Sequence, residues 1–221
     1  YGPNFKSKWR TLTINSKSNF MYLRAIKNRV TGLKPAYQRM YILEQSLNNL
    51  KIKKLKSGLE YKIGRSLDDI ASLVEQRPRW YKNWAKQRFS EGNYCYSVFV
   101  DGKIVSCLWT SFDSVFLPNV DYNLILPGNI AAVLDGWTSP KHRKLGYYSA
   151  AMNFCLSDLK KKTNYQSVYF CIRPENIISL LVHKKLKVVL YLRLFKILNL
   201  KFRKKVEMDC YIESLMRLET K

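Results

Sequence analysis

The stretch with the clearest chemical potential is residues 135–150, DGWTSPKHRKLGYYSA. The apolar run 130–134 before it predicts a buried strand. Pro140 ends regular pairing, and a basic turn at 141–144 leads to Gly146 and a helical pattern. Free N–H groups at a helix start, the helix dipole and a glycine that admits close approach can together hold phosphate. The other reading is an ordinary strand-to-helix connection with solvated lysines, because one glycine is a weaker signal than a multi-glycine fingerprint.

The composition of the chain limits the classes of partner that it could bind. The chain has 221 residues, 47% of them hydrophobic, which is enough for one large domain or one domain with an extension. There are 39 Lys and Arg against 16 Asp and Glu, so the net charge is +23. Such a surface favours nucleic acid, anionic lipid head groups or phosphate-bearing small molecules. A lysine-rich compositional bias without function is the alternative.

Cysteine and histidine usage argues against a metal site or a disulfide framework. The five cysteines are an odd number and contain no CxxC pair, which is typical of reduced, buried thiols in a cytoplasmic protein. Two histidines, His142 and His183, are too few for a histidine-rich metal site, so we expect none. The first residues, YGPNFKSKWR, do not have the usual form of a signal or transit peptide. We therefore expect a cytoplasmic protein, peripheral to the membrane if its basic surface binds anionic lipid.

The chain before Gly58 predicts a basic helical extension, residues 1–57, with Glu44 as its only acidic residue. Helical spacing of apolar residues occurs at 20–30 and again at 37–50. This arm could be a lid, a dimer contact or an anion-binding surface. Two packed helices with solvated lysines are the alternative, and in either case we expect the arm to pack on the rest of the protein.

Residues 58–221 have the pattern of a second, mixed α/β region. Strands are expected at 59–64, 94–100, 103–112, 130–137 and 166–173, with further strands within 120–126 and 188–202. Helices are expected after Ser66, with Asp69 completing a capping box, and at 80–89, 147–162, 174–186 and 208–218. The aromatic side chains of 80–89 can belong to the core or to the wall of a substrate pocket. The apolar segment 188–202 is too charged and too short for a membrane span.

These residues resemble the GNAT (Gcn5-related) N-acetyltransferase superfamily over about 58–202. The run 143–148, Arg-Lys-Leu-Gly-Tyr-Tyr, matches the family's pyrophosphate loop, Gln/Arg-x-x-Gly-x-Gly/Ala, except at Tyr148. That tyrosine resembles members associated with surface-polysaccharide clusters. Residues 176–179, Asn-Ile-Ile-Ser, followed by Lys185-Leu186, look like the family's Asn-x-x-Ser/Ala…Lys-Leu-Gly-Phe helix, with Lys187-Val188 replacing Gly-Phe. The resemblance implies an α/β fold with a mostly antiparallel central sheet flanked by helices.

The resemblance also implies a set of residues that bind acetyl-coenzyme A (acetyl-CoA). The strand is expected to splay from its neighbour and to present main-chain groups to the pantetheine arm. The basic turn is expected to face the pyrophosphate with charge and backbone donors. The residues concerned are Trp137, Thr138, Ser139, Arg143, Lys144, Leu145, Gly146, Tyr147, Tyr148, Asn176 and Ser179.

Two residues are candidates for catalysis. Helical spacing places Asn176, Ser179 and His183 on one face, and His183 stands where the family usually has a tyrosine that protonates the departing thiolate. Asp135 stands where members often carry a carboxylate that accepts the proton of the amine. The alternatives are a half-buried helix histidine and a carboxylate that is paired in a salt bridge.

We therefore expect an acetyl-CoA-dependent N-acetyltransferase in which the amine attacks the thioester directly in a ternary complex. No cysteine lies in a motif for a covalent intermediate. The Tyr148 variant and the aromatic segment favour an amino sugar, nucleotide- or lipid-linked, as the acceptor. The alternative is a catalytically inactive GNAT-like module that binds nucleic acid or anionic membrane through its basic surface.

Overall fold

The computed structural model describes residues 36–162, 164–197 and 200–212. The chain divides into two compact units, Tyr1–Tyr37 with Phe195–Phe202, and Gln38–Leu194 with Arg203–Lys221. The first unit lies mostly outside the described residues, as does the helix predicted at 20–30. Within it, the rings of Phe195 and Phe202 lie 6.4 Å apart. The second unit carries the core and the candidate site.

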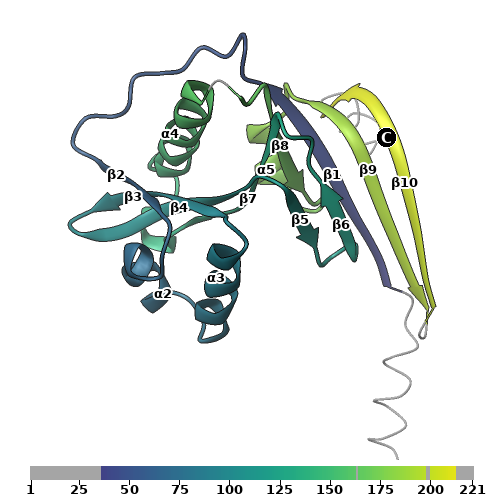
Figure 1. The fold of residues 1–221 in the computed structure, drawn as a ribbon, viewed down its shortest axis with the longest axis horizontal. Helices are drawn as coiled ribbons and strands as arrows, with labels where there is room; N and C mark the ends of the chain where they lie inside the picture. Colours follow the sequence, from purple (N-terminus) through teal and green to yellow (C-terminus); the bar gives the residue numbers. More distant parts are fainter. Residues whose placement is uncertain (1–35, 163, 198–199, 213–221) are drawn as a thin grey trace, which may run out of the picture. The chain divides into compact units, whose positions relative to one another are not determined.

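The main element is an eight-stranded sheet in the order β10-β9-β1-β8-β7-β4-β3-β2 (Figure 1). Its strands are β1 (Ala36–Ser46), β2 (Glu60–Gly64), β3 (Tyr94–Val100), β4 (Lys103–Ser111), β7 (Ile130–Thr138), β8 (Ser167–Ile172), β9 (Lys187–Ile197) and β10 (Leu200–Tyr211). Strands β5 (Ser114–Leu117) and β6 (Tyr122–Ile125) form a separate antiparallel pair. β7 and β8 are parallel, whereas β1–β8, β2–β3, β3–β4 and β4–β7 are antiparallel. The mixed α/β fold with a mostly antiparallel sheet is therefore confirmed.

Helices cover both faces of the sheet, with α5 beside β8 and the others on the β2–β3–β4–β7 part (Figure 1). They are the short η1 (Asp68–Ile70) and η2 (Pro140–His142), and the α-helices α2 (Ala71–Glu75), α3 (Trp80–Ser90), α4 (Tyr147–Lys161) and α5 (Ile177–Val182). α4 lies on one face and buries Ala151, Met152, Cys155 and Leu159. α2 and α3 lie on the opposite face, where Leu73, Tyr81 and Ala85 pack in one apolar cluster with Trp109 of β4. The two faces of β7 are thus approached by different helices.

Several local predictions are confirmed by the elements found. The Ser66 amide donates to the Asp69 carboxylate at 2.9 Å and the Asp69 amide donates to the Ser66 hydroxyl oxygen at 3.4 Å, which is the reciprocal pair of a capping box. The β3–β4 hairpin turns at Asp101 and Gly102, whose φ angles are 49° and 70°. Such positive values at both central residues are what a tight two-residue hairpin needs.

The helix predicted at 37–50 is wrong, because Ala36–Ser46 forms strand β1, which pairs with β8. Met40 and Ile42 pack in one apolar cluster, while Tyr41 and Leu43 pack in another, so the side chains alternate between two buried faces. A strand buried on both faces has a continuous apolar run, and periodicity alone cannot distinguish such a run from a buried helix.

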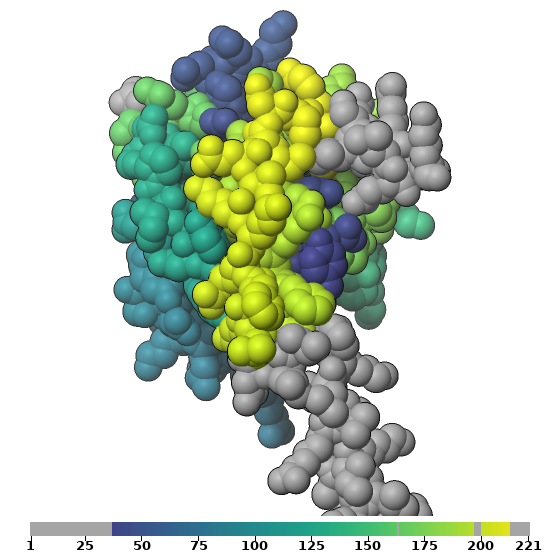
Figure 2. Space-filling view, turned by 90° about the vertical axis from the view of Figure 1, so that its right-hand side faces the viewer, coloured from purple at the N-terminus to yellow at the C-terminus, as the bar shows by residue number. Residues whose placement is uncertain are grey.

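Two helix predictions near the C-terminus are also corrected. β10 runs to Tyr211, so the closing helix predicted from Met208 is wrong over 208–211, and its remainder lies largely outside the described residues. Residues 206–211 alternate between half-buried and exposed, which is the period of a strand. Figure 2 shows β10, in yellow, at the surface. The helix expected to reach Leu186 ends at Val182, with His183 as its C-cap.

Candidate active site

A β-bulge in β7 is the centre of the site. Cys107 of β4 pairs with Trp137 and Trp109 pairs with Leu134, so Asp135 and Gly136 together lie opposite a single residue. Asp135 has a φ of 49°, a left-handed conformation that is uncommon for a residue other than glycine. Bulges of this kind redirect a side chain and are frequent beside active sites. Gly136 is an isolated glycine inside a strand pattern, a signal that could have indicated this bulge from the sequence.

Just before the bulge, β7 and β8 separate, as the family resemblance implied. Their pairing runs from Ile130 opposite Ser167 to Val133 opposite Phe170, although both strands continue. Within the described chain, the edge of β7 from Leu134 to Thr138 therefore has no ladder partner on the β8 side. Main-chain groups along this edge are available to an extended ligand.

The three residues predicted to face pantetheine differ in availability. Trp137 and Thr138 end β7 beside the separation, and the Ser106 hydroxyl donates to the Trp137 carbonyl at 3.0 Å. The Ser139 amide already donates to the Val105 carbonyl at 2.9 Å. Trp137 and Thr138 are the better placed of the three because they belong to the edge of β7 that is not paired with β8, whereas Ser139 lies beyond the strand.

The basic turn ends in the N-terminus of α4. Gly146 is the N-cap with a φ of 82°, and no side chain caps the helix. A Cβ at Gly146 would meet no atom within 4 Å among the described residues, so the space in front of it is open. Lys144 has a φ of 65°, and the Arg143 Nε donates to the Thr138 carbonyl at 3.4 Å. Arg143, Lys144 and Leu145 are all exposed. This combination fits a phosphate group at the helix start.

Tyr148 of α4 packs against Gly136 of the bulge. A Cβ built on Gly136 would lie 2.5 Å from the Tyr148 Cε2, so the ring occupies the space that any side chain at 136 would need. This contact explains why an aromatic residue is accommodated where the family pattern has glycine or alanine, since the small residue stands on the opposing strand. Burial raises the pKa of the Tyr148 phenol to about 12. Tyr147, next to it, lies 5.9 Å from the His142 ring.

The surroundings of Asp135 shift the pKa of its carboxyl group. Desolvation by the surrounding protein raises the pKa of Asp135, while the positive charges of Arg77 and Arg88 act in the opposite direction, and the net shift is upward. The residue as a whole still has an exposed surface, so the carboxyl group is surrounded by protein on one side and can be reached from solvent on the other. A carboxylate with a raised pKa is a stronger base, which suits proton removal from an amine.

The predicted face of α5 is present. The Asn176 side chain caps the helix by accepting from the Ser179 amide at 3.2 Å, and the His183 Nδ1 lies 2.8 Å from the Ser179 carbonyl. His183 is 6% exposed, and its ring lies 4.6 Å from the Phe170 ring. Burial lowers the pKa of His183. A neutral ring with its proton on Nδ1 has no proton on Nε2 to give away. This geometry favours a packing role, and the acid role stays a prediction.

Two arginines on the α3 side of Asp135 were not identified from the sequence, although the aromatic residues around them were named as a possible pocket wall. The Arg77 guanidinium lies 4.6 Å from the Tyr81 ring centroid and 5.6 Å from that of Trp137. The Arg88 guanidinium lies 4.6 Å from the Trp84 centroid. Residues four positions apart share a helix face, so the spacing of Trp84 and Arg88 could have indicated this pair.

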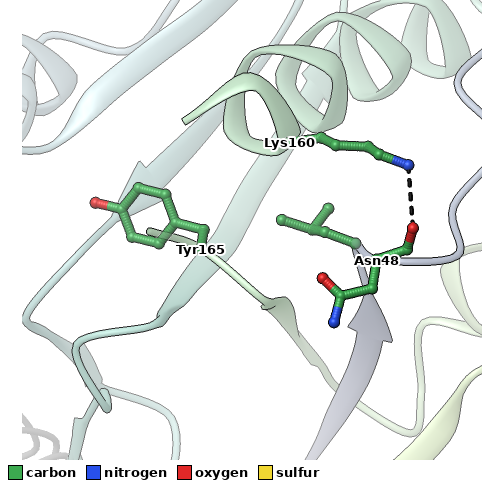
Figure 3. A pocket seen from close by; sticks show the side chains of 4 residues that line it. Asn48, Lys160 and Tyr165 are labelled. Carbon is green, nitrogen blue, oxygen red and sulfur yellow. Dashed lines mark hydrogen bonds between the residues drawn. The ribbon is translucent and has the colours of Figure 1, made fainter. Parts of the chain in front are cut away.

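A separate hollow of about 290 Å³ lies at the far end of α4, lined by Leu47, Asn48, Lys160 and Tyr165 (Figure 3). The Lys160 ammonium donates to the Asn48 carbonyl at 3.2 Å and to the Leu50 carbonyl at 2.8 Å, so its charge is already engaged. At 1.5 Å per residue, the hollow is roughly 20 Å along α4 from Gly146, which separates it from the basic turn.

Neither a metal site nor a membrane-spanning helix is found in the part of the chain that the structure describes. Its His, Cys, Asp and Glu side chains do not form a group of three that could hold a metal ion. No helix in 36–162, 164–197 and 200–212 combines the length and hydropathy needed to cross a bilayer.

The separated parallel strands and the basic turn at the start of α4 are the features that the family resemblance implied. The family model described as the acetyltransferase (GNAT) family matches residues 63–187, more than half of the chain. The chain therefore belongs to the GNAT family.

The fold is shared by two solved structures of low sequence identity. A Drosophila protein is 13% identical, with a TM-score of 0.52 over 81% of this chain and 59% of that one. A conserved protein of unknown function from Staphylococcus epidermidis is 8% identical, with a TM-score of 0.50 over 84% and 68%. A GCN5-related N-acetyltransferase from Kribbella flavida is 10% identical, with a TM-score of 0.43 over 67% and 54%. The chain thus spans little more than half the length of the Drosophila and Kribbella proteins that it matches. No curated protein matched the chain.

Proposed function

We propose that the protein is an acetyl-CoA-dependent N-acetyltransferase. The observation that carries the proposal is the contact between Tyr148 and Gly136, because it joins the uncapped start of α4 to the bulge where β7 leaves β8. A phosphate at Gly146 and an extended arm along Trp137 and Thr138 would then lead to Asp135. When bound, acetyl-CoA supplies an acetyl group as a thioester, which an unprotonated amine attacks directly.

The residues of this chain have distinct parts in the proposed reaction. The first-turn amides of α4, with Arg143 and Lys144, bind and neutralise the pyrophosphate. The free edge of β7 positions the pantetheine arm. Asp135 accepts a proton from the amine, for which its raised pKa is suited. His183 can donate a proton to the departing thiolate only when its ring is charged. Burial of the ring opposes this charging, because it lowers the pKa of His183.

The acceptor we propose is an amino sugar. Aromatic side chains gather on the α3 side of Asp135, where the rings of Tyr81 and Trp84 lie 5.1 Å apart and Trp80 is 59% exposed. Aromatic rings offer a flat apolar face beside a polar edge, which suits a hydroxylated ring. This proposal is tested by comparing kcat/KM for glucosamine with kcat/KM for an aliphatic amine of similar basicity.

Ligand-induced stabilisation tests the function. Acetyl-CoA at about 100 times its Kd should stabilise the folded chain by about 2.7 kcal/mol, which corresponds to a Tm rise of roughly 5 to 10 °C for a chain of this size. Release of the coenzyme A thiol should then depend on added amine. Absence of both effects would reject the proposal.

The net charge of +23 supports a second candidate, an inactive module that binds nucleic acid or anionic membrane. Binding of that kind weakens steeply with salt. Salt-sensitive binding to duplex DNA or phosphatidylserine vesicles, together with no stabilisation by acetyl-CoA, would favour it over the enzyme.

A further inference from the structure

Arg77 and Arg88 bring two positive charges to Asp135 from different places in the chain. Arg77 lies between α2 and α3, and Arg88 lies in the last turn of α3. Both lower the pKa of Asp135, and Arg88 also lowers that of Cys171 in β8. Trp84 and Phe89 of α3 pack in one apolar cluster with Leu134 and Trp137, the residues on either side of the bulge. This packing places α3, and Arg88 with it, against the part of β7 that carries Asp135.

Neither guanidinium is balanced by a carboxylate in an ion pair within the described residues. The closest contacts recorded for both are the aromatic rings of Tyr81, Trp84 and Trp137. The Arg77 Nε is buried without a hydrogen-bond acceptor in the described chain. Burial also lowers the pKa of Arg88. Arg77 and Arg88 are half-buried residues, so a ligand can still reach them. A buried donor without a partner is costly, so the pair is suited to an anion that arrives from outside.

That anion is distinct from the phosphates expected at the basic turn. α3 and α4 cover opposite faces of the sheet (Figure 1), and Gly146 with its lysines belongs to the α4 side. Asp135 lies between, in the strand that both faces share. An anion on Arg77 and Arg88 therefore approaches from the α3 side, as an acceptor would.

We propose that the acceptor carries an oxyanion, a phosphate or a carboxylate, which Arg77 and Arg88 bind while its amine is presented to Asp135. The inference rests on the proposed acyltransfer function. Guanidinium groups suit this task, because their forked donors match the oxygens of phosphate and carboxylate. The same two charges lower the pKa of Asp135, and so they partly offset the repulsion between a bound oxyanion and its carboxylate.

Matched acceptors test the inference. Transfer should be compared between glucosamine and glucosamine 6-phosphate, and between ethanolamine, phosphoethanolamine and β-alanine. Loss of a hydrogen bond to a charged group typically weakens binding by about 10- to 100-fold. We therefore expect kcat/KM to be higher by that factor for the anionic member of each pair. Phosphoethanolamine against β-alanine then distinguishes phosphate from carboxylate.

In Arg77→Gln and in Arg88→Gln, the ratio of kcat/KM for the anionic acceptor to that for the neutral acceptor should fall to near one. Arg79→Gln is the matched control, because it removes the same charge from an exposed residue of the same segment and should keep the preference. Equal use of neutral and anionic acceptors by the parent, or an unchanged preference in Arg77→Gln, would overturn the inference.

A readout without turnover separates this inference from the proposed function. Inorganic phosphate should change the tryptophan fluorescence of the parent and of Arg79→Gln, and the change should be lost in Arg77→Gln. Stabilisation by acetyl-CoA should be the same in all three. If phosphate has no effect but acetyl-CoA stabilises the chain, the inference fails and the function stands; if acetyl-CoA has no effect, the function itself fails.

Discussion

The ring of Tyr148 fills the space above Gly136, with its Cε2 only 2.5 Å from where a Cβ at 136 would lie. Gly136→Ala should therefore force the ring to move and destabilise the protein. Overpacking of this kind typically costs about 1–3 kcal/mol. Thermal unfolding of the variant should show a Tm lower by roughly 2 to 12 °C.

The matching change on the helix gives the control. Tyr148→Gly restores the glycine of the family pattern, and the double variant Gly136→Ala with Tyr148→Gly should be more stable than the sum of the single effects predicts. Residues in contact show such non-additivity, whereas independent residues add within about 0.5 kcal/mol. Additive losses would mean that the two residues do not share one space.

Gly146 should be required for acetyl-CoA binding. Its φ of 82° strains any other residue, and a side chain would project into the open space at the helix start. Gly146→Val should abolish the Tm rise with acetyl-CoA while the protein still unfolds cooperatively. Gly102→Val, with the same type of strain at a φ of 70° in the β3–β4 turn, should keep the ligand-induced rise. A full rise in Gly146→Val would contradict the assignment.

Asp135→Asn should lower turnover by about 10²- to 10⁴-fold without changing stabilisation by acetyl-CoA. The raised pKa of Asp135 predicts an acidic limb in kcat/KM above the ordinary range of a carboxyl group, because activity requires the ionised form. Arg77→Gln removes a charge that lowers this pKa, so the limb should move to higher pH. A limb that does not move would show that another group titrates.

His183 should be a packing residue. Burial lowers its pKa below the ordinary 6.5, so the unfolded chain takes up more protons than the folded one once the pH falls below about 6.5. Its contribution to stability is therefore intact above that pH and decreases from there down to the folded pKa. His183→Gln should show a smaller loss of Tm between pH 7.5 and pH 5.5 than the parent.

Kinetics decide between this role and the predicted acid role of His183. A packing role leaves turnover per folded molecule nearly unchanged in His183→Gln. An acid role predicts a loss of about 10²- to 10⁴-fold, partly restored by His183→Tyr. Both readouts should be taken where chemistry limits the rate.

Elements with a strong local signal were predictable. The alternation of 94–100 and 103–112 around Asp101-Gly102, and the capping box of Ser66 and Asp69, are determined by neighbouring residues. β1 was not, because its burial on both faces comes from strands far away in the chain. In the site, the phosphate turn was visible as a motif. The grouping of Arg77 and Arg88 around Asp135 arises only when α3 folds over β7.

The position of β1 affects how the chain can fold. Tyr41 pairs with Ile172, so strand β1 is synthesised about 130 residues before its partner, and closing so long a loop is entropically costly. At 5–20 residues per second, the ribosome needs roughly 6 to 26 s to deliver β8. During that time Met40 to Leu43 are an apolar strand without a ladder, and such strands pair readily with other chains. A nascent chain therefore faces its greatest risk of misassembly before the family domain, residues 63–187, is complete.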